Sequence, residues 1–409
     1  MTNEPTIGKP LLGLCMIVKD EARGIVQTLR SVDLLIDYAT VVDTGSTDDT
    51  VAIVKTTLEE MGVEHTLYSE PFVDFTTTRN RALELHGDRT ELVLMVQGDD
   101  VIVFDDGPSE NEAKRVRDQL VTQRAAGGGV WNMTRVMGST RFRYPFVFAS
   151  ADGWHFKGRT HEQLTCNNPC SKEHTLDGIK VVRPQDGTPK SKRERWLADL
   201  SLLNQDLYDD PMNARTHFYL AQTHECLGDL QQALRIYTTR SLMTDGWWEE
   251  TYEAKFRIAR VMQAMGVPWI AVQQAYLDAH AFCPARAEPL HEIAKHWYDE
   301  RSYSLCYVFA TRAACLAIPN AKLFVDQDVY VWKAADLVAI SAWWLAKHLA
   351  TENRDALLAV GAAAARSALA ARPDDERIRV NAGHYQAAGW IAGSALPTIR
   401  DCVGPSIEQ

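Results

Sequence analysis

The sequence predicts a two-part chain, in which an α/β domain with a mixed, mostly parallel sheet precedes an all-α solenoid. Its length of 409 residues exceeds that of one ordinary domain. Over the first hundred residues, short apolar runs alternate with segments of helical apolar spacing, which is typical of a parallel sheet with helices on both faces. After residue 196 nearly every segment has helical spacing, which indicates a separate helical region.

The first hundred residues are expected to alternate between strands and helices. Strands are predicted at 11–18, 38–43, 63–68 and 91–96, and helices at 21–35, 46–62 and 77–87. The helix at 46–62 begins with capping residues and ends on Gly62, as a helix should. In sheets of this kind, ligands bind beyond the carboxyl ends of the strands, so the residues there are site candidates.

Residues 128–182 contain short aromatic and β-branched runs, which predict antiparallel strands that complete the sheet. The polar segment that follows, rich in charge and containing Pro and Gly, is the best linker candidate. We therefore place the first domain at 1–185, the linker at 186–195 and the helical domain at 196–409.

The helical part shows an internal repeat. Residues 215–240 place small and large residues in the order of a tetratricopeptide repeat, and 254–276 and 287–314 follow the order more loosely. Arg240 stands where the repeat usually has a small residue, so the match is imperfect. Three copies in register indicate a helical solenoid.

Composition excludes several classes of protein. The net charge of −11 argues against a general affinity for phosphate backbones or anionic membranes. The eight cysteines stand mostly alone in apolar runs, which favours reduced thiols over a disulfide framework or a zinc site. The first ten residues lack the plan of a signal peptide, and no apolar run approaches the ~20 residues of a membrane helix. We expect a cytoplasmic protein without membrane insertion.

The segment LVLMVQGDDVIVF at 92–104 is the most specific chemical signal. An apolar strand runs into Gln97, Gly98, Asp99 and Asp100, although adjacent carboxylates repel and resist burial, so a positive group should compensate them. A carboxylate beside a glycine at a strand end can ligate a hard divalent ion, which would bridge the phosphates of a nucleotide. The plainer interpretation is an acidic surface turn.

Three further segments supply candidate residues. Asp43, in VVDTGSTDDT, ends a strand and can accept from the N3–H of uracil or a ribose hydroxyl, or simply belong to a well-capped turn. Arg79 is a forked donor for a diphosphate or a surface residue. In HFKGRTHEQL, His161 can complete a metal shell and Glu162 can act as a general base, or both are structural.

Taken together and in this order, the segments at 14–21, 41–50, 79–83, 97–100 and 161–163 resemble glycosyltransferase family 2. The resemblance is to the bacterial and viral branch whose catalytic domain carries a tetratricopeptide tail, and it covers nearly the whole chain. It implies the GT-A fold, which is Rossmann-like, a sugar-nucleotide donor that is usually uridine-linked, Mn²⁺ or Mg²⁺, and inversion at the anomeric carbon.

By position, the resemblance assigns nucleotide binding to residues at strand ends and nearby turns: Val18, Lys19, Glu21, Asp43, Arg79 and Gln97. Asp99 is the metal ligand of the Asp-X-Asp motif, and His161 is a second candidate ligand. Gln97 replaces the first Asp of that motif, which leaves a hydrogen-bonding group without charge. The general base is Glu162, with Asp100 and Asp152 as alternatives.

The sequence therefore predicts an inverting hexosyltransferase that uses a UDP-sugar. A protein or peptide acceptor is preferred because solenoids hold peptides, and a saccharide is the next choice. A hydroxylated base in phage DNA is a further alternative, since 189–195 is basic. Gln97 also motivates a catalytically inactive binding platform, and the Trp-rich helices leave a homodimer open.

Overall fold

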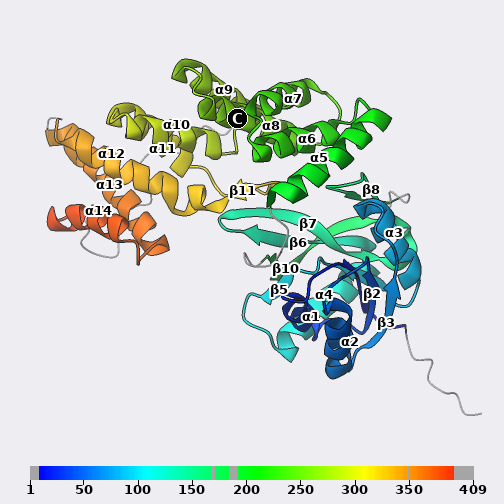
Figure 1. Cartoon of the computed structure of the whole chain (residues 1–409). Helices are drawn as coiled ribbons and strands as arrows, with labels where there is room; N and C mark the ends of the chain where they lie inside the picture. Colours follow the sequence, from blue (N-terminus) through cyan, green and yellow to red (C-terminus); the bar gives the residue numbers. More distant parts are fainter. Residues whose placement is uncertain (1–8, 167–170, 184–191, 349–350, 391–409) are drawn as a thin grey trace, which may run out of the picture. The chain divides into compact units, whose positions relative to one another are not determined.

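In the computed structural model of the chain, the described residues are 9–166, 171–183, 192–348 and 351–390. The chain forms two compact units, Met1–Gly228 and Asp229–Gln409, and Figure 1 labels many of their elements. Each unit is described by itself.

The first unit is built on a mixed, mostly parallel sheet with strand order β3-β2-β1-β4-β7-β6-β10-β5. Four neighbouring strands run parallel: β3 (Glu64–Ser69), β2 (Tyr38–Asp43), β1 (Leu12–Val18) and β4 (Leu92–Met95). The helices between them are α1 (Ile25–Val32), α2 (Thr50–Met61) and α3 (Phe75–His86). These elements confirm the expected alternation, and Gly62 ends α2 in the left-handed conformation at φ +69°.

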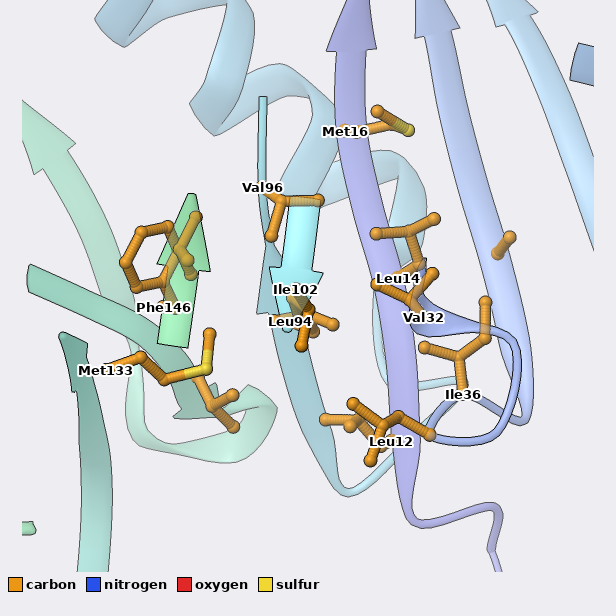
Figure 2. Packing of buried hydrophobic residues seen from close by; sticks show 14 of the residues in the cluster. Leu12, Leu14, Met16, Val32, Ile36, Leu94, Val96, Ile102, Met133 and Phe146 are labelled. Carbon is orange, nitrogen blue, oxygen red and sulfur yellow. The ribbon is translucent and has the colours of Figure 1, made fainter. Parts of the chain in front are cut away.

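Side chains alternate along each strand, so successive residues point to opposite faces of the sheet. The two faces pack against different elements. Leu12, Leu14 and Met16 of β1 belong to one core cluster with apolar residues of α1, α2 and α4 (Glu110–Ala125). Figure 2 shows part of this cluster around β1 and β4. Cys15 belongs to the opposite face, in a second cluster that includes Ala82 of α3 and residues of β8 and β9. Both faces of β1 are therefore dry, which explains its continuous apolar run.

The strands from 101 to 182 extend the sheet in a pattern that corrects one expectation. They are β5 (Val101–Phe104), β6 (Gly128–Met137), β7 (Thr140–Ala149) and β10 (Lys172–Val182). β7 is antiparallel to β4 and β6, as expected, but β10 runs parallel to β6. The prediction of uniformly antiparallel strands is wrong here, because β8 (Trp154–Lys157) and β9 (Gln163–Cys166) form a hairpin outside the sheet between β7 and β10. The short helix η1 (Ser150–Asp152) connects β7 to this hairpin.

The first unit ends at Gly228, beyond the domain boundary expected at 185. It includes α5 (Lys192–Asp209) and α6 (Ala214–Leu227), which hydrogen-bond to the loop between β8 and β9. Most of the expected linker at 186–195 lies outside the described residues. The compact unit extends further than the composition suggests because those hydrogen bonds join segments about 40 to 50 residues apart.

The second unit confirms the expected helical region. Its helices are α7 (Leu230–Leu242), α8 (Trp248–Ala264), α9 (Trp269–Phe282), α10 (Glu288–Asp299), α11 (Tyr303–Ala314), α12 (Ala334–Ala346), α13 (Thr351–Ala371) and α14 (Glu376–Ala387). A two-residue strand β11 (Val325–Asp326) and a π-helical turn η2 (Val329–Lys333) lie between α11 and α12. Small residues such as Ala362 and Ala363 fill the core of α10 to α14, so the helices approach closely. The tetratricopeptide identity of these helices stays a prediction.

Two further expectations concern the whole chain. Cys15, Cys283 and Cys306 carry free thiols, as expected for them, and Cys170 and Cys402 fall outside the described residues. Across the described ranges, no helix combines the length and the apolar character that crossing a membrane requires.

Candidate functional site

The loops after β1 and β2 hold each other at the carboxyl edge of the sheet. The Thr44 amide donates to the Val18 carbonyl over 2.9 Å, and the Asp20 amide donates to Ser46 Oγ over 3.0 Å. Asp43 accepts from the amides of Gly45 (3.1 Å) and Ser46 (3.2 Å), so its half-buried carboxylate organises its own turn. Of the neighbouring candidates, Val18 is buried and Lys19 is exposed.

The acidic turn follows β4 at the same edge. Asp100 closes the turn with two hydrogen bonds to Gln97: its amide donates to the Gln97 carbonyl (3.1 Å) and its Oδ2 accepts from the Gln97 amide (3.0 Å). Between them, Gly98 lies against Glu21 so closely that a Cβ on Gly98 would be 2.8 Å from Glu21 Cγ. Glycine at 98 is therefore what allows the Glu21 side chain to lie over the turn.

Two arginines compensate the paired aspartates. Asp100 is completely buried and forms an ion pair with Arg135 of β6. Arg183, directly after β10, forms an ion pair with Asp99 over 3.0 Å, lies 3.7 Å from Asp100 and donates to the Gln97 side chain. The expectation of a positive group beside the carboxylates is thereby met by two guanidinium groups of the chain itself.

Glu21 is the carboxylate of this cluster that still has an oxygen available to bind a ligand. Its Oε2 is buried and, within the described part of the chain, has no hydrogen-bond partner. Burial and, less strongly, the charge of Asp99 raise the pKa of Glu21 to about 7 against the opposing charge of Arg183. A buried carboxylate oxygen without a donor is ready to accept a ligand group or a cation.

Arg79 and Glu162 form a second, connected cluster. Both side chains are buried, and they form an ion pair with each other. Burial opposes the charge of Arg79, but the charges of Glu162 and Asp100 and a hydrogen bond with Tyr144 of β7 raise its pKa. The next residue, Asn80, fixes β8 beside α3 through two hydrogen bonds with the backbone of Phe156, at 2.8 and 3.0 Å. The RN pair at 79–80 thus brings the loop that carries Glu162 onto α3.

Two candidates lie away from these clusters. The ring of His161 stacks on Tyr219 of α6, with centroids 4.2 Å apart and an interplanar angle of 10°. Burial and, less strongly, the charge of Arg215 lower the pKa of His161 to about 4. Asp152 pairs with Arg124 over 3.1 Å. It follows Ala149, which pairs with the first residue of β4, so Asp152 lies at the amino end of that strand, opposite the acidic turn.

The carboxylates of this cluster can hold a divalent cation only if a bound substrate supplies further ligands. Over the described residues, no group of three or more His, Cys, Asp or Glu side chains is arranged to hold a metal. The charges of Asp99 and Glu21 influence each other, and both residues offer carboxylate oxygens, which Mg²⁺ and Mn²⁺ prefer. Magnesium commonly binds through one or two carboxylates together with substrate phosphates, and this pair meets that requirement.

Sequence reasoning missed three residues of the site: Arg135, Tyr144 and Arg183. Arg183 follows a strand, so the rule that selected Asp43 and Asp99 would have selected it if β10 had been identified as parallel to β6. Arg135 and Tyr144 lie inside strands, where the rule about strand ends does not apply. The only local signal for Arg135 was its charge within the run NMTRVM.

Comparison with known proteins gives structural neighbours of low similarity. No protein-family model and no curated protein matches the chain. A crystal structure of S. aureus TarS 1-349 in complex with UDP is 15% identical, covers 65% of this chain and 82% of that chain, and has a TM-score of 0.32. The mannosyltransferase PcManGT from Pyrobaculum calidifontis, in complex with GDP-Man and Mn²⁺, is 14% identical over 75% of this chain and 86% of that chain, with a TM-score of 0.34.

A third neighbour resembles part of the chain. TTC0263, a thermophilic TPR protein of Thermus thermophilus, is 17% identical and covers 47% of this chain and 92% of that chain, with a TM-score of 0.28. All three TM-scores lie below 0.5.

Proposed function

We propose that this chain is a glycosyltransferase that moves a hexose from a UDP-sugar to a hydroxyl or other nucleophile of an acceptor. The observation that carries the proposal is the arrangement at the carboxyl ends of β1 and β4. There, the unpartnered carboxylate oxygen of Glu21 and the side chain of Asp99 lie beside the guanidinium group of Arg183. A nucleoside diphosphate needs this combination of cationic donors and carboxylates for a bridging metal.

Each residue receives a role from its chemistry. Arg79 and Arg183 would donate to the diphosphate, since guanidinium groups match phosphate oxygens in forked geometry, and would stabilise its charge as it leaves. Asp99 and Glu21 would hold Mn²⁺ or Mg²⁺, which supplies further charge neutralisation to the leaving group when bound. Val18, Lys19, Asp43 and Gln97 would line the nucleoside pocket, where the carboxylate of Asp43 has lone pairs beyond those that cap its turn.

The chemical step is a single displacement. The carboxylate of Glu162 takes the proton of the acceptor hydroxyl, the acceptor oxygen bonds to the anomeric carbon, and the bond from that carbon to the diphosphate oxygen breaks. Attack opposite the leaving group inverts the anomeric centre. Glu162 is favoured over Asp100, which Arg135 and the Gln97 amide enclose, and over Asp152, which lies at the other end of β4. A protein or peptide is the acceptor we favour, followed by a saccharide or a hydroxylated DNA base.

UDP release from a panel of UDP-sugars, measured with Mn²⁺, Mg²⁺ or EDTA, tests the proposal without a known acceptor. We expect slow hydrolysis of one donor that EDTA abolishes and that Asp99→Ala lowers on the order of 10²-fold. Asp118→Ala is the matched control, because Asp118 is an exposed partner of Lys114 on α4. No release from any donor, together with no calorimetric binding of UDP, would contradict the proposal and favour a binding platform.

A second variant tests the base. Glu162→Gln keeps the size of the side chain and removes its ability to take a proton, so turnover should fall sharply while UDP binding is retained. Near-normal transfer by Glu162→Gln would exclude Glu162 as the base.

A further inference from the structure

The loop that carries Glu162 is anchored by helices that follow the sheet in the chain. This loop, residues 158–162, connects β8 to β9. The Arg159 amide donates to Asp206 Oδ2 of α5 over 2.9 Å, and Thr160 Oγ1 donates to Asp199 Oδ1 of α5 over 2.8 Å. Arg215 Nε of α6 donates to the carbonyl oxygen of His161 over 3.1 Å. Three consecutive residues before Glu162 are therefore bonded to α5 or α6.

The residue directly before Glu162 has an unusual backbone conformation. His161 has φ +49°, in the left-handed region that residues other than glycine rarely adopt. Such a conformation persists only where surrounding contacts over-determine it. Here the ring of His161 stacks on Tyr219, and the guanidinium carbon of Arg215 lies 4.7 Å from the centroid of the same Tyr219 ring. Arg215 thus supports both the backbone and the stacking partner of His161.

The conformation of His161 sets the direction in which the chain presents Glu162. On its other side, the loop contacts α3, where the Phe75 amide donates to the Arg159 carbonyl over 3.2 Å and Arg79 pairs with Glu162. Glu162 therefore lies between α3, which supplies its ionic partner, and α6, which supports the peptide unit before it. A loop base needs such support because its reacting atoms must stay within a fraction of an ångström of the productive position.

We propose that Arg215 is a positioning residue that holds Glu162 for proton removal, acting through the carbonyl and ring of His161. This proposal rests on the proposed function, in which Glu162 is the base. It makes α6 part of the catalytic unit, although the sequence assigns that helix to the solenoid. Arg215 itself is not expected to touch the donor, so its loss should change kcat and leave the KM of the donor nearly constant.

The test compares the whole chain carrying Arg215→Ala, Arg215→Lys or the control Arg235→Ala. Arg235 is exposed on α7 and donates to Gln232, so its loss removes an arginine with a helical neighbour and leaves the site untouched. Two quantities are measured for each: kcat and KM for UDP release, and hydrogen–deuterium exchange of the amides at 158–163. The exchange measurement reports on the loop whether or not a donor is turned over.

We expect Arg215→Ala to lower kcat on the order of 10²-fold with the donor KM within about threefold of wild type, and to speed exchange at 158–163. Arg215→Lys keeps one donor for the His161 carbonyl and should recover kcat to within about tenfold. Should Arg215→Ala fail to fold, the kcat and exchange of Arg215→Lys carry the test alone. Unchanged kcat and unchanged exchange would overturn the proposal, as would an equal loss in Arg235→Ala. An inactive wild type whose exchange still responds to Arg215→Ala would refute the proposed function and leave the anchoring intact.

Discussion

Replacing Arg135 with methionine should destabilise the first unit strongly, because it leaves the Asp100 carboxylate buried without its main counter-charge. Asp100 has no exposed surface, and the Arg135 side chain is only 11% exposed. Methionine has a similar length and suits the apolar side of this position, where the guanidinium carbon lies 5.3 Å from the centroid of the Phe146 ring. The substitution therefore removes the charge with little change in packing.

The size of the effect follows from the partners that Asp100 retains. Removing one member of a buried ion pair typically costs about 3–5 kcal/mol. Asp100 would keep the Gln97 amide at 3.0 Å, and Arg183 stays 3.7 Å away, so we expect the lower end, about 3 kcal/mol. For a unit that ends at residue 228, this loss corresponds to a fall in Tm of roughly 6–12 °C.

Differential scanning calorimetry of the wild type and Arg135→Met measures the fall. Arg115→Met is the control, since Arg115 forms an exposed pair with Glu112 on α4 and its loss should leave Tm unchanged. Adding Asp100→Asn to Arg135→Met should recover at least about 1 kcal/mol relative to the sum of the single effects, because no charge is left unpaired. A loss below about 1 kcal/mol in Arg135→Met would show that the pair does not hold the turn and would refute this reasoning.

Two further predictions concern stability. Because the folded state raises the pKa of Glu21 from its ordinary value of 4.5 to about 7, ionising Glu21 costs stability increasingly between these pH values and fully above 7. Glu21→Gln should therefore raise Tm at pH 8 and lose this advantage at pH 4, whereas a gain independent of pH would contradict the cause. Gly13→Ala should cost about 1–3 kcal/mol in urea unfolding, since its Cβ would lie 2.5 Å from His86 Cε1 and 2.6 Å from Thr90 Oγ1. Gly24→Ala, with no atom within 4 Å of its Cβ, is the control, and equal effects of the two would count against overpacking.

Patterns of apolar and polar residues over short stretches of sequence were sufficient to predict most strands and helices of the first unit. The strand expected at 38–43 is β2 with the same bounds, because an apolar run between polar turns needs no distant information. The helix expected at 46–62 begins later, at Thr50, because residues 44–49 form the turn in which Asp43 accepts two amides. The pairing direction of β10 was beyond such patterns, since the same alternation fits a parallel or an antiparallel neighbour.

The candidate site also contains features that the sequence predicts and features that it does not. Rules about strand ends selected Glu21, Asp43 and Asp99, because polar residues after buried strands are visible in the sequence itself. The same rules could not show that Asp43 serves its own turn or that His161 faces α6, since these outcomes depend on the rotation of single side chains.

The sequence by itself determined the order of strands and helices over the first hundred residues, the division into an α/β part and a helical part, and the carboxylates at the sheet edge. Each of these features depends on residues that lie close together in the sequence. Only the tertiary structure decided which cations those carboxylates meet, because Asp100 lies 35 residues from Arg135 and Gln97 lies 86 residues from Arg183. It also decided that α6 supports the loop of Glu162, through a bond that joins residues 54 apart. Ion pairs and backbone supports of this kind form only when the sheet brings distant segments together.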